Sequence, residues 1–369
     1  RPPRGSPLAI PAGAASISPG SGDPRHGGWR YPPRDYGRWL ELVRNLASHC
    51  RDRYGPAEVS KWYWELWNEP DIFYWTGTVP EYCRLYDYTV AGLHAALPRA
   101  LVGGPATTSS VSRAASSAFL RAFRQHVTRG INHLTGQVGT RIDFVSYHAK
   151  GSSFARDPQA SKATPTLSGL LDNVDAGLSV IGEFPELGAI EVILSECDPD
   201  GWAAGTVHDN PNLAYRNSEY YANYVAGTVT GLIDRTATTG AQIDGMLTWA
   251  FLFEDRDYFE GFRTLSTNGI DKPVLNVFRL LARLGRTRLA LSADQNQVGT
   301  AGDRPLITGL AAIDEAEGIQ IFLASHHDDW EKTTPSRVTV TLDGADPGRR
   351  YHVYQMLVSR DSGNAHTVW

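Results

Sequence analysis

The sequence has few cysteines, no long apolar run and no excess of basic charge. Its three cysteines among 369 residues are too few and odd in number for a disulfide framework, and they do not decide the compartment. No stretch of about 18 apolar residues is present, so we expect no membrane-spanning helix. Lys and Arg total 35 against 40 Asp and Glu, a net charge of −5, which argues against nucleic-acid binding.

Apolar and aromatic residues are plentiful. The chain is 41% hydrophobic and contains 10 Trp, 16 Tyr and 12 Phe, which excludes a wholly disordered chain. At roughly 150 residues per domain, the length predicts two domains or one large domain with an appendage. Aromatic rings suit the apolar faces of sugars, but they also fill large cores. Composition alone leaves both interpretations open.

The chain divides into three stretches of different character. Residues 1–35 hold eight Pro and six Gly and are predicted to be a loop region. Residues 36–287 alternate short apolar runs with segments of helical period. Residues 288–369 contain short alternating runs between Asp, Gly and Pro turns, without helices, which predicts a small antiparallel β-sandwich domain.

The alternation in 36–287 predicts an α/β fold. Five strand–helix units follow a first helix over 36–50, and apolar strands alternating with helices are typical of a parallel sheet covered by helices. The predicted strands are 61–67, 100–103, 143–147, 191–194 and 244–251. The predicted helices that follow them are 80–98, 114–128, 167–182, 217–233 and 273–285. Four further strands are predicted at 306–310, 318–325, 336–342 and 351–358.

Polar side chains gather at the ends of these predicted strands. Glu69 follows the first strand, His148 closes the third, Glu196 follows the fourth, and Trp249 is predicted to lie in the fifth. In a β/α barrel the carboxyl ends of the strands form the rim that holds the active site. Two glutamates there could act as the acid and the ionised carboxylate that glycoside hydrolysis requires.

Several motifs, in this order, make the chain resemble glycoside hydrolase family 39, which holds β-xylosidases and α-L-iduronidases. They are Glu65-Leu-Trp-Asn-Glu-Pro-Asp71, Gly103-Gly-Pro105, Ser146-Tyr-His-Ala-Lys-Gly151, Leu194-Ser-Glu-Cys-Asp-Pro199, Gly261-Phe-Arg263 and Asn268-Gly-Ile-Asp-Lys-Pro273. Each motif is weak, but their shared order is specific. The resemblance spans about residues 30–287 and continues weakly to the last residue. It implies a retaining glycosidase built on a (β/α)8 TIM barrel that is followed by a β-domain.

The resemblance also implies roles for individual residues. Glu69 would be the general acid/base and Glu196 the nucleophile. Asn68 would hold the 2-hydroxyl of the sugar, His148 would line the −1 subsite, and Trp249 would be the sugar platform. Each has a structural alternative, namely a strand-end cap for the motif that carries Asn68 and Glu69, a solvated loop carboxylate for Glu196, and core packing for His148 and Trp249.

The family's acid/base glutamate follows the fourth barrel strand, whereas only 68 residues precede Glu69 here. We therefore expect the first three strands to be absent and the chain to be a piece shortened at both ends. Such an open barrel would expose strand edges and could fold poorly. A sugar-binding relic without activity is the corresponding alternative to an enzyme.

The choice of substrate depends on two cations. Lys150 and Arg263 could pair with the carboxylate of a uronide, but Lys150 could also pair with an acidic residue of the barrel such as Glu254 or Asp255. We favour hydrolysis of β-D-xylosidic bonds in xylo-oligosaccharides, with an iduronidase-like or other family activity as the alternative. A buried lysine then needs an anionic partner from the protein.

No cofactor or metal is predicted. The run His326-His327-Asp328-Asp329 is interpreted as a polar turn, since it lacks helical ligand spacing, and Cys197 as a small buried residue. The expected partner is an oligosaccharide or small-molecule substrate, with no nucleic acid and no membrane, and homo-oligomerisation stays open. No signal peptide is visible, and both a cytoplasmic and a periplasmic or secreted location stay open.

Overall fold

The computed structural model describes residues 28–109, 114–152, 165–202, 204–292, 305–314, 316, 318–332, 335–346, 348 and 350–369. Most of the predicted N-terminal loop lies outside these residues. The chain packs into two compact units. The first holds residues up to 149 together with 172–196 and 241–247, and the second holds 150–171, 197–240 and 248–369. No helix within the described residues combines the length and apolarity needed to cross a membrane.

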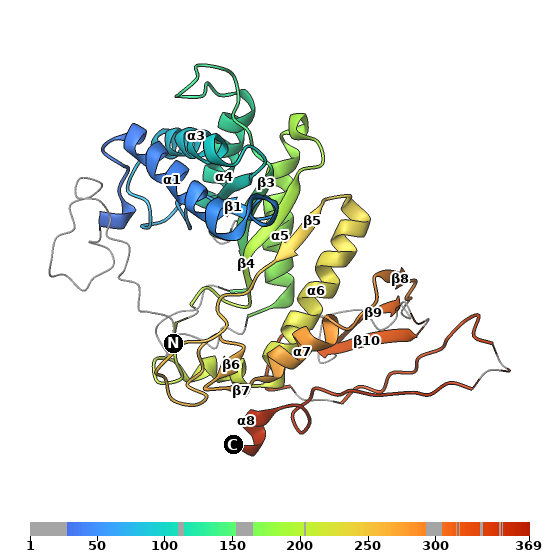
Figure 1. Cartoon of the computed structure of the whole chain (residues 1–369). Helices are drawn as coiled ribbons and strands as arrows, with labels where there is room; N and C mark the ends of the chain where they lie inside the picture. Colours follow the sequence, from blue (N-terminus) through green and yellow to red (C-terminus); the bar gives the residue numbers. More distant parts are fainter. Residues whose placement is uncertain are drawn as a thin grey trace. The chain divides into compact units, whose positions relative to one another are not determined.

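A curled parallel sheet of five strands, in the order β1-β2-β3-β4-β5, is the centre of the fold (Figure 1). Its strands are β1 (Tyr63–Glu65), β2 (Leu101–Thr107), β3 (Phe144–Lys150), β4 (Glu191–Asp198) and β5 (Ile243–Met246). The pairs β1–β2, β2–β3 and β4–β5 are parallel. The predicted α/β class and the position of every predicted strand in this region are confirmed, although β5 ends earlier than expected.

Helices alternate with these strands along the chain, as predicted. They are α1 (Tyr36–Tyr54), α2 (Pro56–Val59), α3 (Val79–Ala96), α4 (Ala114–Arg129), α5 (Leu167–Gly182), α6 (Glu219–Thr239) and α7 (Pro273–Leu281), with 3-10 turns at Gly28–Arg30, Pro185–Leu187 and Pro211–Asn217. Helices α3 to α6 connect successive strands, α1 and α2 precede β1, and α7 follows β7 (Ile270–Asp271). Local chemistry sets their ends. Asp35 caps α1, and Thr78 and Glu81 form a reciprocal capping box that begins α3.

The core of the first unit is aromatic. α1 packs on α3, α3 on α4, and α4 on β2. Tyr82 of α3 is fully buried, and its ring lies 5.2 Å from Phe119 and 5.7 Å from Phe123, both in α4. Its hydroxyl donates to the carbonyl of Leu66 (2.8 Å) just after β1. The helix layer therefore holds the segment that follows the first strand.

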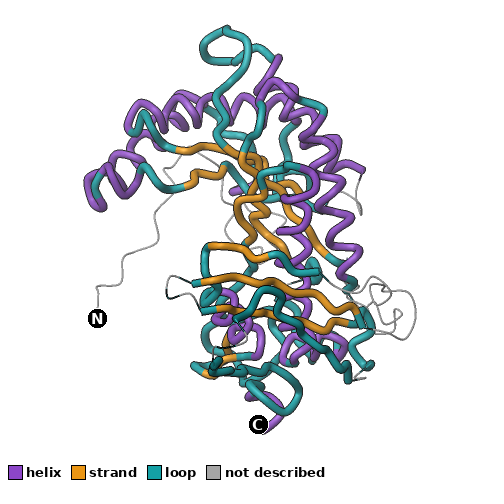
Figure 2. Tube along the Cα trace, turned by 90° about the vertical axis from the view of Figure 1, so that its right-hand side faces the viewer, coloured by secondary structure: helices purple, strands orange, loops and turns teal. Residues whose placement is uncertain are grey.

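The second unit contains α6, α7 and two small antiparallel sheets. The two-stranded sheet pairs β6 (Ser266–Thr267) with β7 (Ile270–Asp271). The three-stranded sheet has the order β10-β9-β8, formed by β8 (Thr287–Leu289), β9 (Leu306–Ile313) and β10 (Ile319–His326). Figure 2 shows the strands of these sheets in orange. A short helix, α8 (Ala365–Val368), lies near the C-terminus.

Of the expected β-sandwich, the described residues of this region show one three-stranded antiparallel sheet, and the sandwich itself stays a prediction. The predicted strands over 306–310 and 318–325 are present as β9 and β10. The alternating runs 336–342 and 351–358 are extended but form no ladder in the part of them that the structure describes. Their apolar side chains, such as Val353 and Tyr354, remain exposed. Alternation alone cannot make a strand where no second layer covers its apolar face.

Gly103 sets the close approach of β2 to β3. A Cβ at this position would lie 2.3 Å from the carbonyl oxygen of Phe144. We expect Gly103→Ala to lower the free energy of unfolding by about 1–3 kcal/mol, because the backbone of β3 must shift. Chemical denaturation measures this. Gly182→Ala, in a helix position where nothing lies within 4 Å, is the control and should be neutral or stabilising. Equal losses in the two variants would contradict the packing argument.

Candidate active site

The loop that follows β1 carries Glu69. Its backbone N–H donates to the carbonyl of Ala106 in β2 (2.9 Å), and the indole N–H of Trp67 donates to the carbonyl of Tyr74 (3.0 Å). Trp67 and Glu69 have positive φ angles of 70° and 46°. Such left-handed residues cost roughly 1–3 kcal/mol each when they are not glycine, and they cluster at functional sites. The surrounding contacts hold Glu69 in this conformation.

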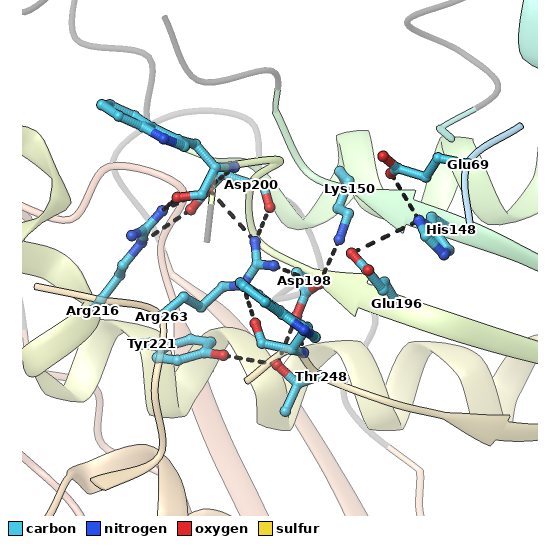
Figure 3. A network of polar contacts seen from close by, with 12 residues as sticks. Glu69, His148, Lys150, Glu196, Asp198, Asp200, Arg216, Tyr221, Thr248 and Arg263 are labelled. Atoms are coloured by element: carbon cyan, nitrogen blue, oxygen red, sulfur yellow. Dashed lines mark hydrogen bonds and ion pairs between the residues drawn. The ribbon is translucent and has the colours of Figure 1, made fainter. Parts of the chain in front are cut away.

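Glu69, His148 and Glu196 lie together in the first unit (Figure 3). Nδ1 of His148, in β3, is 2.9 Å from Oε1 of Glu69 and 3.7 Å from Oε2 of Glu196, in β4. One oxygen of each glutamate and a ring nitrogen of the histidine all lie within 4.8 Å of one another. The histidine is buried, whereas the glutamate side chains are 16% and 21% exposed. Solvent can therefore reach both carboxylates.

The other predicted residues fall in different surroundings. Asn68, beside Glu69, is exposed. Trp249 is not in a strand, which corrects the prediction: β5 ends at Met246, and the N–H of Trp249 points to the carboxylate of Asp198 (3.3 Å) instead of a neighbouring strand. The Trp249 side chain is 43% exposed. Cys197 is buried, as predicted, and burial raises the pKa of its thiol.

Lys150 and Arg263 meet at one carboxylate in the second unit (Figure 3). Nζ of Lys150 is 2.5 Å from Oδ2 of Asp198, and Nη2 of Arg263 is 2.9 Å from the same oxygen. The hydroxyl of Thr248 donates to the other oxygen (2.6 Å). All three charged side chains are buried. The alternative that Lys150 pairs with an acidic residue of the protein is therefore confirmed, although the partner is Asp198 in the neighbouring strand and not one of the two examples named, Glu254 and Asp255.

A second buried carboxylate extends this network. Asp200 accepts from Nη2 of Arg216 (2.7 Å) and from the hydroxyl of Tyr215, and Nη1 of Arg263 is 3.6 Å away. Burial alone would raise the pKa of Asp200, but the two arginines and the tyrosine outweigh it and lower the pKa to about 2. Asp198 and Asp200 together raise the pKa of Arg263, although burial alone would lower it. These shifts favour the charged forms of Asp200 and Arg263.

Asp198 and Asp200 had no role in the sequence-based prediction. The available signal was their position, two and four residues after Glu196, in a segment where strand periodicity places every second side chain on one face. Only pairing across strands shows that these carboxylates hold Lys150 and Arg263. That pairing cannot be read from spacing within one segment.

Comparison with known proteins shows the family of the chain. The model of glycosyl hydrolases family 39 matches residues 15–369, so the chain belongs to that family. It is 25% identical over 351 residues to a β-xylosidase of Caldicellulosiruptor saccharolyticus, covering 92% of this chain and 63% of the relative. It is 28% identical over 337 residues to α-L-iduronidase of Homo sapiens, covering 84% and 48%. The chain thus spans about half to two thirds of these relatives.

Solved structures give the same family and fold. A bacterial orthologue of human α-L-iduronidase superposes with a TM-score of 0.65 at 28% identity, over 80% of this chain and 48% of the other. A monomeric β-xylosidase from Caulobacter crescentus superposes with a TM-score of 0.58 at 23% identity, over 78% and 52%. The resemblance to family 39 is therefore confirmed, while the relatives divide between two substrates.

The role of Asp198 can be tested by stability. We expect Asp198→Asn to lower the free energy of unfolding by about 3–5 kcal/mol, because it leaves two buried cations without their shared anion. Asp234→Asn is the matched control, since Asp234 pairs with Arg288 (2.9 Å) at an exposed site and should cost under about 1 kcal/mol. Denaturant unfolding of both variants decides. A loss for Asp198→Asn no larger than the control's would refute the argument.

Lys272 gives a prediction on pH. It is buried, donates to the carbonyl of Phe262 (2.9 Å), and has its pKa lowered to about 7 by burial and by the charge of Arg216. The unfolded chain, with an ordinary lysine pKa near 10.5, binds more protons between these values. The free energy of unfolding contributed by Lys272 should therefore rise from about pH 7 to pH 10.

Denaturant unfolding at pH 7 and pH 9.5 measures this contribution. Lys272→Met should remove part of the rise seen in the parent chain, whereas Lys61→Met, at an exposed lysine paired with Glu58, should leave it unchanged. The pKa of His366 is lowered mainly by burial and also by the charge of Lys272. Both pH values lie above the range in which His366 titrates, so this histidine does not add to the measured difference. An identical pH dependence in the parent and Lys272→Met would contradict the assignment.

Proposed function

We propose that this chain carries the catalytic centre of a retaining exo-glycosidase, with Glu69 as acid/base and Glu196 as nucleophile. The observation that carries the proposal is the approach of the two glutamates, with one oxygen of each within 4.8 Å. Retaining glycosidases have carboxyl groups about 5–5.5 Å apart, whereas inverting enzymes need about 6.5–9.5 Å to admit a water. Family membership supports the same chemistry.

The reaction proceeds by two displacements. Glu69 donates its proton to the glycosidic oxygen while the ionised Glu196 attacks the anomeric carbon, which breaks the glycosidic bond and forms a glycosyl ester. Glu69, now ionised, takes a proton from water, whose oxygen attacks the same carbon and releases Glu196. Each displacement inverts the carbon, so the product keeps the configuration of the substrate.

His148 and Asn68 complete this proposal in the first unit. With its proton on Nδ1, the buried ring of His148 donates to Oε1 of Glu69 (2.9 Å) and fixes that carboxylate beside Glu196. Asn68, exposed next to Glu69, is proposed to bind the 2-hydroxyl of the sugar. Strands β1 to β5 are proposed to correspond to the fourth to eighth strands of the (β/α)8 barrel, and exposed Trp249 to serve as a sugar platform.

For the substrate we propose a β-D-xyloside of xylo-oligosaccharide type. A xylose ring carries no charge at C5, so a xylosidase needs its own anion for any buried lysine. Asp198 is that anion for Lys150 and also for Arg263. Both cations therefore have an anionic partner within the protein, in keeping with the similarity to a β-xylosidase.

One observation favours a uronide as the second candidate. The buried network combines three cations, Lys150, Arg216 and Arg263, with two carboxylates, Asp198 and Asp200. Lys150 and Arg263 share one carboxylate, and cations of this kind would suit a substrate that brings a carboxylate. The similarity to human α-L-iduronidase supports this alternative.

Sugar release from aryl β-D-xyloside and aryl α-L-iduronide tests both the reaction and the substrate. We expect turnover of the xyloside, and a loss of at least about 100-fold in Glu196→Ala, because no carboxylate remains to form the ester. Exposed Glu58 on α2 supplies the control Glu58→Gln, which should retain full activity. Iduronide turnover would instead assign Lys150 and Arg263 to carboxylate binding. A folded chain with no turnover of either would favour a sugar-binding relic.

The two glutamates should behave differently. Glu69→Ala should lose about 10²–10⁴-fold with a poor aryl leaving group, which needs the proton, and far less in the first step with dinitrophenol, which does not. Added azide should rescue Glu69→Ala with retained configuration, since the ester on Glu196 still forms. Equal sensitivity of both variants to the leaving group would overturn the assignment of roles.

A further inference from the structure

Two groups of His and carboxylate side chains in the described residues gather closely enough to hold a metal ion. One is the candidate active site. The other, formed by Asp87, His126 and His133, plays no part in the proposed reaction. We propose that this second group, here called the Asp87 cluster, is a structural binding site for a divalent transition-metal ion of the zinc type.

The Asp87 cluster joins three separate segments of the first unit. Asp87 lies in the middle of α3 and is 1% exposed. His126 lies in the last turn of α4, and His133 lies in the loop that follows that helix. The histidine side chains are 11% and 36% exposed. The buried carboxylate of Asp87 thus contacts the imidazoles of His126 and His133, and the imidazole of His133 is accessible to solvent.

The ligand atoms have nearly the spacing of a metal site. Nε2 of His126 lies 3.0 Å from Oδ1 and 3.1 Å from Oδ2 of Asp87, and Nδ1 of His133 lies 2.9 Å from Oδ2. Four-coordinate zinc keeps its ligands about 2.0–2.1 Å away, which places neighbouring ligand atoms roughly 3.3 Å apart. The nitrogen–oxygen pairs therefore lie close to this spacing, and the two ring nitrogens lie within 4.8 Å of each other. Water can complete the coordination on the exposed side of His133.

Neighbouring groups already orient the carboxylate. The hydroxyl of Thr140 donates to Oδ1 of Asp87 (2.6 Å), and the backbone N–H of His133 donates to Oδ2 (2.8 Å). These bonds and those from the two imidazoles outweigh burial and lower the pKa of Asp87. Outer hydrogen bonds of this kind commonly hold metal ligands in position.

The donor set selects the class of ion. Two imidazole nitrogens and one carboxylate suit zinc and similar transition ions, whereas calcium and magnesium prefer sites built from oxygen alone. No cysteine belongs to the Asp87 cluster; Cys83, one turn earlier on α3, has its pKa raised to about 12 by burial. Binding would tie α3, α4 and the loop over 131–140 together, and would stabilise the first unit.

Zinc titration of the untagged, chelator-treated 369-residue chain tests the proposal. Calorimetry should give one equivalent bound, and the melting temperature should rise with zinc and fall back when chelator is added. Cobalt should give the visible absorption of a tetrahedral site without a thiolate charge-transfer band. Magnesium should change neither quantity. Zinc that binds without raising the melting temperature would overturn the structural role.

Three variants locate the ion. His133→Ala removes the most exposed ligand with little risk to folding and should weaken zinc binding at least 10-fold; Asp87→Asn, a nearly isosteric change, should do the same. His49→Ala, at an exposed histidine on α1, should bind like the parent. Circular dichroism confirms that each variant is folded. The proposal is wrong if zinc does not bind, or if His133→Ala and Asp87→Asn bind it as tightly as His49→Ala does.

Discussion

Parallel pairing of neighbouring strands is the constraint on which the rest of this structure depends. Pairing of β1 with β2 and of β2 with β3 places the carboxyl ends of these strands at one edge, where Glu69 and His148 meet. The close approach of β2 to β3 requires a residue without a side chain, which is Gly103. Strand β2 also supplies the carbonyl of Ala106, which accepts the N–H of Glu69. Residues far apart in sequence become neighbours because of this backbone register.

Buried charge is the second organising feature, and in the network around Asp198 and Asp200 a few side chains share it. Asp198 holds Lys150 and Arg263, and Asp200 holds Arg216. Such networks contribute little net stability compared with apolar packing, but removing one member is costly. Each cation therefore requires its anion, and the geometry of the network is fixed by this mutual dependence.

Much of the fold could be predicted from local signals. The helical period predicted α1, and Pro80 marked the start of the predicted helix that the structure shows as α3. Glu69, His148 and Glu196 were predicted because polar residues at strand ends share an edge. Trp249 was misplaced, because its N–H points to the Asp198 side chain, an interaction between distant residues. The strands predicted over 336–342 and 351–358 are not formed for a related reason, because alternation does not show whether a partner strand exists.

Strand β4 shows how strongly two functional carboxylates restrict the register of one strand. Glu196 and Asp198 occupy alternate positions on it, with buried Cys197 between them. Because side chains alternate between the two faces, a shift by one residue would exchange both carboxylates for their neighbours at once. Insertions and deletions within this strand are therefore far more damaging than substitutions. The register of β4, more than its composition, is therefore what keeps Glu196 and Asp198 at their positions.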